Sequence, residues 1–293
     1  MKVKIMHILW ATDFSDEAGN ALKIAQAFAK AFGARLTALH VVPDYAPLLH
    51  EVVAAQVADF SRRVRELRKA TRKKIETEAK RRRITFKDIL VESGSAPKKI
   101  VETAEKKKAD LIVIGRKGLS AMEKVFVGSV ANQVLRASSV PVLMTGGGKP
   151  RASFKKILVP TDFSVQEEIE RDYAWALAGA FGADLTLLHV LELHEYSFSP
   201  RELQAVFDDV LGRLKKRKAR TKGSFQVRED VTRAVNAAGG IVEYAERKKS
   251  DLIVMSTCTE GFLQRFFLGS NTEKVIAYAG IPVFAIPAAF CKV

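Results

Sequence analysis

The chain carries the same sequence pattern twice, and this internal repeat limits its fold more than any other feature. Four pairs of segments match in the same order: HILWATDFS (7–15) with KILVPTDFS (156–164), ARLTALHVV (34–42) with ADLTLLHVL (183–191), KKADLIVIG (107–115) with KKSDLIVMS (248–256), and SSVPVLM (138–144) with AGIPVFA (279–285). The offset is 149 residues for the early pairs and 141 for the late ones. A linker rich in glycine and small polar residues, GGGKPRAS (146–153), separates the copies. We therefore expect two domains, residues 1–148 and 149–293.

Within each copy, short apolar runs alternate with segments of helical spacing. In the first copy we expect strands at 7–12, 35–42, 84–93, 110–115 and 140–145, and helices from Ser15 or Asp16 to Gly33, at about 50–82, at 97–108 and at 130–138. Most of the strands are apolar on both faces, which is typical of a parallel sheet covered by helices. With right-handed crossovers, the pattern predicts an α/β fold of two tandem doubly wound domains, each with a five-stranded parallel sheet.

The charge of the chain is strongly uneven. The 293 residues are 47% hydrophobic and 28% charged, as in a globular protein, and the net charge is +15. Two runs account for nearly all of this excess: 62–83, with 12 Lys/Arg against 3 Glu, and 213–222, with 7 Lys/Arg and no acid. Both are predicted helices or helix ends, so they are either solvated helix faces or a surface for a polyanion such as nucleic acid.

Cysteine content and hydropathy bear on where such a chain works. Cys258 and Cys291 are too few for a disulfide framework and point to a reducing compartment. The longest apolar stretch, 275–290, is too short for a membrane span and contains two prolines and a glycine. We expect a cytoplasmic protein with no membrane role.

The segment GRKGLSAMEKVFVGS (115–129) places glycines after the fourth predicted strand. Gly115 lies at the carboxyl edge of the sheet, where open α/β folds bind ligands, and glycine there allows positive φ and close approach of a ligand. Gly128 and Ser129 precede a helix whose free N–H groups suit phosphate, and Ser129 can also serve as the N-cap. The spacing is neither a Walker A loop nor GxGxxG. On spacing alone, a phosphate site competes with an ordinary turn and cap.

Other polar residues at the strand ends have two interpretations. Asp13 and Asp162 follow the first strand of each copy, and each is either an Asx-turn residue or a carboxylate that accepts from a bound nucleoside. His40 and His189 lie inside apolar strands and are better interpreted as hydrogen-bonded core histidines than as catalysts. No His/Cys grouping has the spacing of a metal site, and no catalytic residue can be assigned.

These motifs resemble the universal stress protein family over nearly the whole chain, in tandem form. The family's nucleotide motif, Gly-x2-Gly-x9-Gly-Ser/Thr, is matched by the glycine segment, and TDFS and ADLIVIG also fit. The resemblance implies a Rossmann-like domain with strand order 3-2-1-4-5 that binds ATP, and it leaves open whether Mg²⁺ accompanies the nucleotide. The binding residues that it implies are Ala11, Thr12, Asp13 and Val41 at the adenine end, Gly115 and Gly118 along the ribose and phosphate path, and Gly128 and Ser129 at the phosphates.

The second copy departs from this motif. Gly269 and Ser270 remain at the helix start, whereas Ser256 and Thr259 replace the first two glycines. The β-branched Thr259 disfavours positive φ, and either side chain can occupy the space that a phosphate would need. We therefore expect a degenerate second site, weak or empty.

The leading hypothesis is a cytosolic ATP-binding stress-response or regulatory protein that holds its nucleotide mainly in the N-terminal domain. Because family members often pair through their fifth strands, the resemblance implies an internal pseudo-dimer; a homodimer of chains and an unidentified protein partner stay open. One alternative is polyanion binding by the helices 62–83 and 213–222, which is not favoured because aromatic residues are sparse there. Another is slow hydrolysis of an adenine nucleotide, for which no general base stands out, although Arg116 and Lys117 can offset phosphate charge unless both are solvated.

Overall fold

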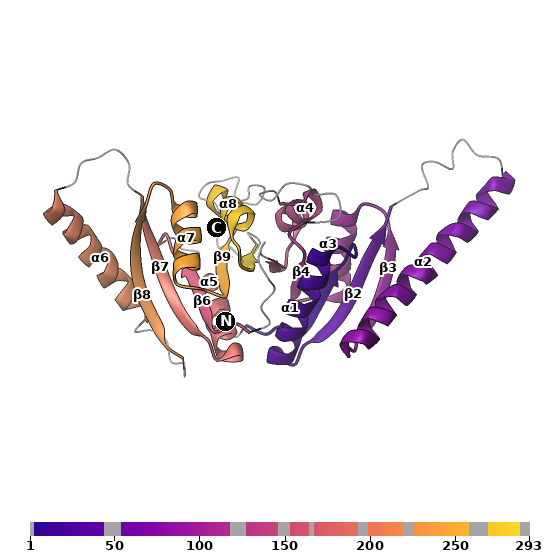
Figure 1. Ribbon diagram of the computed structural model, residues 1–293, viewed down its shortest axis with the longest axis horizontal. Helices are drawn as coiled ribbons and strands as arrows, with labels where there is room; N and C mark the ends of the chain where they lie inside the picture. The colour runs from indigo at the N-terminus through magenta and orange to yellow at the C-terminus, as the bar shows by residue number, and fades with distance from the viewer. Residues whose placement is uncertain are drawn as a thin grey trace.

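The computed structural model describes residues 3–43, 54–117, 127–145, 153–163, 167–192, 199–218, 225–257 and 269–287. Figure 1 shows two halves of similar build side by side, with the long helices α2 and α6 at the outer ends. The N-terminal half consists of β1 (His7–Ala11), α1 (Asp16–Phe32), β2 (Arg35–Val42), α2 (Ala54–Arg82), β3 (Asp88–Ser93), α3 (Ala96–Lys107), β4 (Leu111–Ile114), α4 (Ser129–Ala137) and β5 (Val142–Met144). The C-terminal half consists of β6 (Lys156–Pro160), α5 (Glu167–Phe181), β7 (Asp184–Glu192), α6 (Pro200–Lys218), β8 (Val227–Ala234), α7 (Ala237–Arg247), β9 (Leu252–Ser256), α8 (Ser270–Tyr278) and β10 (Val283–Ile286).

The strands form one continuous sheet of ten, in the order β3-β2-β1-β4-β5-β10-β9-β6-β7-β8. Each half therefore has the predicted order 3-2-1-4-5. Among the described strands, β5 and β10 form the one antiparallel pair, with Leu143 opposite Phe284. The prediction of two five-stranded parallel sheets is confirmed for each half, and the structure adds that they merge. The fifth strand of each sheet would otherwise be an open edge, and pairing these two edges satisfies their backbone groups.

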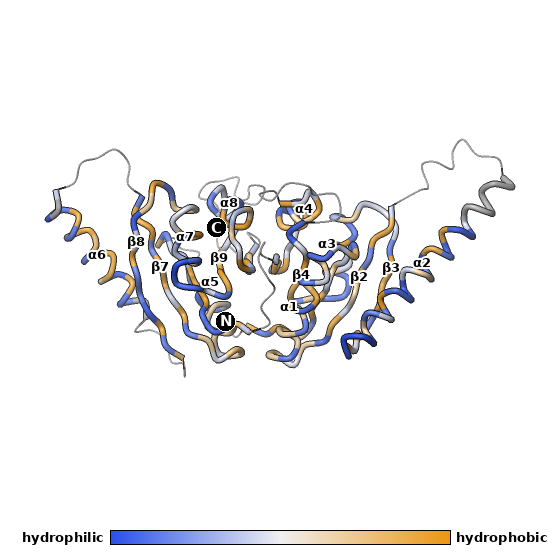
Figure 2. Tube along the Cα trace, viewed as in Figure 1, coloured by the Kyte–Doolittle hydropathy of each residue, from blue (hydrophilic) through white to orange (hydrophobic). Residues whose placement is uncertain are grey.

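Successive side chains of each strand point to opposite faces of the sheet, so the core has two layers. In β1, Ile8 and Trp10 pack in the cluster that includes α1 and α2, whereas Leu9 and Ala11 pack in the cluster that includes α3 and α4. Successive strand residues point to opposite faces, so a strand apolar at every position is buried on both sides. Figure 2 shows the consequence, with hydrophobic colour along the strands and hydrophilic colour toward the C-terminal end of α2.

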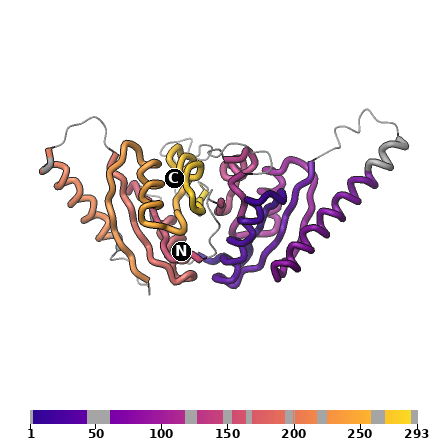
Figure 3. Tube along the Cα trace, in the orientation of Figure 1, coloured from indigo at the N-terminus to yellow at the C-terminus, as the bar shows by residue number. Residues whose placement is uncertain are grey.

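An aromatic cluster joins the two halves on the α1–α5 face. The ring of Phe28 in α1 lies 4.9 Å from that of Phe181 at the end of α5 and 5.4 Å from that of Phe154 before β6, measured between centroids. Phe28 and Phe154 are fully buried, together with Phe284 of β10. Burying each such side chain contributes roughly 1.5–3 kcal/mol, so this seam is part of the hydrophobic core. Figure 3 shows the two halves beside each other, coloured along the chain.

Polar contacts join the halves on the opposite face, between α4 and α8. The carboxylate of Glu273 accepts hydrogen bonds from Asn132 Nδ2 at 3.1 Å and from Arg136 Nη2 at 3.0 Å. Residues 132 and 273 are equivalent under the 141-residue offset, so the same position of each copy faces its counterpart across the seam.

Local signals fix the ends of α1 as predicted. The Ser15 Oγ accepts from the Ala18 N–H at 3.1 Å, so Ser15 is the N-cap. Gly33 ends the helix in the left-handed conformation, with φ of 65°. Among the described helices, none has the length and apolar character that would let it cross a membrane.

Candidate functional site

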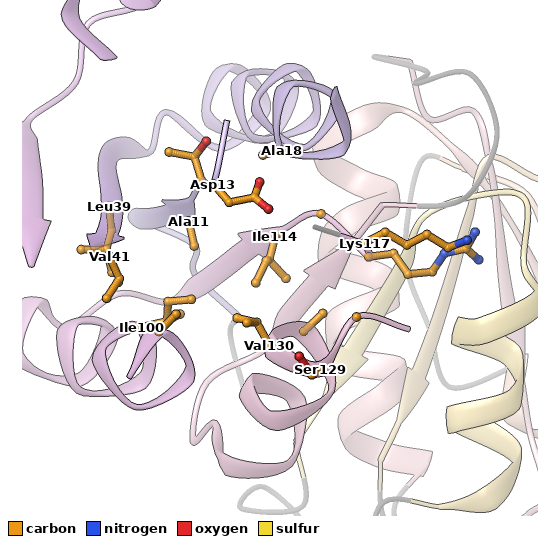
Figure 4. Close-up of a pocket in the computed structure, with 16 residues that line it drawn as sticks. Ala11, Asp13, Ala18, Leu39, Val41, Ile100, Ile114, Lys117, Ser129 and Val130 are labelled. Carbon is orange, nitrogen blue, oxygen red and sulfur yellow. The ribbon is translucent and has the colours of Figure 1, made fainter. Parts of the chain in front are cut away.

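A cavity of about 230 Å³ lies in the N-terminal half at the carboxyl ends of β1, β2 and β4 (Figure 4). The ends of these strands meet there because β1 lies between β2 and β4 in the sheet. Seven of the predicted binding residues line the cavity: Ala11, Thr12, Asp13, Val41, Gly115, Gly128 and Ser129. Gly118 lies outside the described residues.

One wall of this cavity is apolar. Its hydrophobic side chains come from two strands and two helices: Leu39, Val41, Ile100, Ile114 and Val130. Figure 4 shows Asp13 on the α1 side of the cavity and Ser129 near the start of α4. An apolar wall with a few polar groups at its rim is the usual form of a small-molecule pocket.

The turn between β1 and α1 is held by its own side chains. Asp13 Oδ1 accepts from the Ser15 N–H at 3.0 Å, and Thr12 Oγ1 accepts from the Phe14 N–H at 3.0 Å. Phe14 has a φ of 66°, and these bonds stabilise that left-handed residue. The Asx-turn interpretation of Asp13 is therefore correct, but this bond uses one of several acceptor sites on the carboxylate.

His40 supports the same turn from β2. Its Nδ1 donates to the carbonyl oxygen of Thr12 at 2.7 Å, and its ring lies 4.7 Å from that of Phe14. The prediction of a hydrogen-bonded histidine is confirmed, although the side chain is half-buried. His40 thus positions the residues beside the cavity.

Gly115 is needed for a reason that differs from the one predicted. The described glycines with positive φ are Gly33, Gly94 and Gly182, so the expectation of positive φ at Gly115 is wrong. A Cβ added to Gly115 would lie 3.0 Å from the backbone carbon and the Cβ of Glu17. Glycine at this position lets the start of α1 pack against the end of β4.

The start of α4 also differs from expectation. Gly128 is the N-cap and Ser129 the first helical residue, so the prediction that Ser129 caps the helix is wrong. Gly128 has no side chain with which to cap the helix. The N–H groups of the first turn, which lack intrahelical partners, suit an anion beside the cavity.

Arg116 does not serve the cavity with its charge. It is only 4% exposed, and its Nη1 donates to three carbonyl groups at the C-terminal end of α8, at 2.8–3.1 Å. Burial lowers the pKa of this guanidinium below its usual value, and the charge of Glu17 opposes that shift. Of the two cations that the sequence suggested for phosphate, Lys117 remains at the cavity edge, where Figure 4 shows it extending away from Asp13.

A second cavity, of about 440 Å³, occupies the equivalent place in the C-terminal half. Its turn repeats that of the first half: Thr161 Oγ1 accepts from the Phe163 N–H at 3.1 Å, and His189 Nδ1 donates to the Thr161 carbonyl at 2.7 Å. Ser256 lines this cavity without closing it, and the expectation that its side chain takes the space of a phosphate stays a prediction. Thr259 lies outside the described residues.

Glu170 in α5 changes the character of this second cavity, and no motif in the sequence pointed to it. The side chain is 8% exposed, and its Oε1 accepts from the Ser256 N–H at 2.6 Å. Burial raises the pKa of Glu170 to about 7, against the hydrogen bonds from Ser256 and with help from the charge of Asp162. The equivalent residue in α1 is Ala21, so the 149-residue offset contained the signal.

The basic helix α2 has a structural role in addition to its charge. Arg68 donates to the carbonyl of Val91 at 2.5 Å and Arg72 to that of Ile89 at 2.8 Å. Both carbonyls belong to β3, an edge strand, so these arginines satisfy groups that an open edge leaves unpaired. The run 213–222 extends beyond the described residues, and polyanion binding stays a prediction. Among the described residues, no group of three or more His, Cys, Asp or Glu is placed to hold a metal ion.

Comparisons with known proteins give the family. The sequence model of the universal stress protein family matches residues 4–146 and again residues 153–287. A universal stress protein of Methanocaldococcus jannaschii is 35% identical over 137 residues, which are 47% of this chain and 79% of that protein. One from Thermus aquaticus is 35% identical over 142 residues, which are 47% of this chain and 96% of that protein.

The two-half architecture also recurs in a solved structure. The crystal structure of a universal stress protein from Archaeoglobus fulgidus matches with a TM-score of 0.66 at 21% identity, over 96% of this chain and 98% of its own. An identity of 21% supports the fold alone. The family is shown by the sequence model, whose two matches together cover most of the chain. The chain therefore belongs to the universal stress protein family, whose pattern it carries twice in tandem.

Proposed function

We propose that this chain is a cytoplasmic ATP-binding protein of stress response or regulation, which holds the nucleotide mainly in its N-terminal half. The observation that carries the proposal is the cavity at the end of β1, β2 and β4. Segments far apart in the sequence meet there, and they combine an apolar wall, a carboxylate and an uncapped helix start.

Each part of this cavity fits one part of the nucleotide. The adenine ring lies against the apolar side chains near Val41, and Asp13 accepts from the amino group of the base. The phosphates lie at the start of α4, where the N–H groups after Gly128 and the helix dipole favour negative charge. Lys117 is the described cation at the cavity edge that can approach the phosphate tail.

The proposal includes an internal pseudo-dimer of the two halves. The antiparallel pairing of β5 with β10 and the aromatic cluster around Phe28 support it. In that arrangement the nucleotide segment of one half reaches the other half directly, because the Arg116 side chain binds the end of α8. Nucleotide binding can then alter a surface that both halves share.

Matched glycine substitutions test the nucleotide site. Gly128 has φ −58° and ψ 147°, and its counterpart Gly269 has φ −56° and ψ 129°, a region that valine adopts readily. Both Gly128→Val and Gly269→Val should therefore fold. In calorimetric titrations, we expect Gly128→Val to weaken ATP binding at least about tenfold, which is about 1.4 kcal/mol, and Gly269→Val to leave it unchanged.

Equal ATP affinity in wild type and folded Gly128→Val would remove this site assignment. Loss in both variants would remove the preference for the N-terminal half. Analysis of the products after prolonged incubation with ATP separates a binding protein from a slow hydrolase.

A further inference from the structure

We propose that the C-terminal cavity is a second ligand site, for an adenine nucleoside whose 5′ end is uncharged or positively charged, and that it rejects 5′-phosphates. The inference rests on the proposed function for one point. It takes the turn between β1 and α1, and the equivalent turn after β6, as the parts that contact the adenine base.

The base end of the second cavity is retained. Asp162 and the Thr161 turn line it, as do Leu188 and Val190, the equivalents of apolar wall residues in the first cavity. The hydrogen bond from Phe163 N–H to the Thr161 hydroxyl is 3.1 Å, against 3.0 Å in the first half. The histidine bond to the turn carbonyl is 2.7 Å in both halves. A base that fits one turn therefore fits the other.

At the far end of the second cavity, two polar side chains bond the backbone of Ser256. Ser256 donates its N–H to Glu170 at 2.6 Å, and its carbonyl accepts from the Thr272 hydroxyl at 2.8 Å. In the first half, the equivalents of these three residues are a glycine and two alanines, at positions 115, 21 and 131. A site that had only lost its function would not need two polar side chains bonded to the backbone of one residue, because each buried polar group is unfavourable unless it is paired.

The second cavity has a more acidic lining than the first. Three carboxylates line it, from Asp162, Glu170 and Glu192, and none of its described lining residues is a lysine or arginine. The first cavity has one carboxylate, that of Asp13, and Lys117 at its edge, since the guanidinium of Arg116 is directed to α8. A phosphate placed near Glu170 would meet a buried like charge in a poorly screened environment, whereas an ammonium group would be attracted.

The second cavity is larger than the first, so its additional polar side chains do not fill it. Its volume is about 440 Å³, against about 230 Å³ for the first. Apolar side chains such as Ile241 and Met255 line it together with the polar rim. The combination of an apolar surface, a retained base end and the buried carboxylate of Glu170 at the far end selects a nucleoside with a basic 5′ substituent.

The test uses 5′-amino-5′-deoxyadenosine, adenosine and ATP as probes, titrated calorimetrically at pH 7.5 into the full chain. The variants are Glu170→Ala, which copies Ala21 of the first half, Glu170→Gln, which keeps the shape without the charge, and Gly128→Val. We expect the amino-nucleoside to bind Gly128→Val as it binds wild type, and to bind both Glu170 variants at least about tenfold more weakly. We expect adenosine to bind Glu170→Gln as it binds wild type.

Two outcomes separate this inference from the proposed function. Amino-nucleoside binding that depends on Glu170, in a chain that does not bind ATP, supports the second site and contradicts the proposed function. ATP binding that depends on Gly128, with no effect of the Glu170 variants on any probe, overturns the second site and leaves the proposed function standing. Unfolding midpoints of the variants show that each is folded at the titration temperature.

Discussion

The two cavities lie at the same place in two halves of the same build, and they differ at one end. Both keep the turn after the first strand, the histidine that supports it and the glycine that starts the last helix. They differ where the fourth strand ends, because the first half has Gly115 against the start of α1 and the second has Ser256 bonded to Glu170. A duplicated fold thus preserves the scaffold while the chemistry of each site changes through a few residues in contact with one another.

The contact between the two halves is also asymmetric. Breaking it should have the largest effect on the free energy of unfolding. Arg116 sends its side chain across to α8, whereas its equivalent in the second half is Thr257. Arg116→Thr copies that residue and leaves three carbonyl groups without their charged donor. We expect the free energy of unfolding in urea to fall by roughly 3 kcal/mol.

The matched control for that variant is Arg136→Ala, which removes an exposed ion pair across the same seam. Such pairs contribute at most about 1 kcal/mol. If Arg116→Thr is no more destabilising than Arg136→Ala, the buried arginine does not hold the halves together.

The buried carboxylate predicts a pH dependence that belongs to the second half. The pKa of Glu170 is raised from 4.5 to about 7 in the folded protein. A raised pKa means that its stabilising contribution is complete below the unfolded value and is lost as pH rises through 7. Because a shift of that size corresponds to roughly 3 kcal/mol, wild type should lose about that much relative to Glu170→Gln between pH 4.5 and 8.

The measurement is urea unfolding of both proteins across that pH range, with the difference between them plotted against pH. The sign is specific, because an ordinary exposed glutamate would give no difference. A difference that stays flat from pH 4.5 to 8 would mean that Glu170 is not buried as described.

The close approach at Gly115 predicts a smaller effect. Gly115→Ala adds one carbon at 3.0 Å from the backbone of Glu17, and such overpacking is unfavourable by about 1–3 kcal/mol. Gly179→Ala in α5 is the control, because an added Cβ there meets nothing within 4 Å. That control should stabilise the chain by about 0.5–1 kcal/mol, since alanine favours helix over glycine. Thermal unfolding of the two variants should therefore shift in opposite directions.

The smallest expected effect on stability concerns the turn after the first strand of each half, which both cavities share. Lys74 Nζ lies 4.0 Å from the ring centre of Phe14, and the Arg213 guanidinium lies 3.9 Å from that of Phe163. We expect Lys74→Met and Arg213→Met each to lower the free energy of unfolding by about 0.5–1 kcal/mol. Losses that differ by more than about 1 kcal/mol would show that the two turns are not equivalent.

The repeated apolar runs and the strand ends predicted the strands and the position of the first cavity, because these are local signals. The strand order was implied by the resemblance to the family. Local signals could not predict the pairing of β5 with β10, since the two edges are distant in sequence, and only the resemblance to the family implied pairing through the fifth strands. The role of Arg116 was missed for the same reason, because its acceptors lie 160 residues away or more. Glu170 was missed because a glutamate near a helix start usually faces solvent, and only alignment with Ala21 places it in the core.

The number of ATP molecules bound per chain tests the central claim most directly. The two cavities have the same scaffold, and their difference lies in the residues at the far end of each. Calorimetric titration of the wild-type chain at pH 7.5 should therefore give one ATP per chain, and Gly128→Val should greatly weaken that binding. Two equivalent ATP sites per chain, or one site that survives Gly128→Val and is lost in Gly269→Val, would contradict the account.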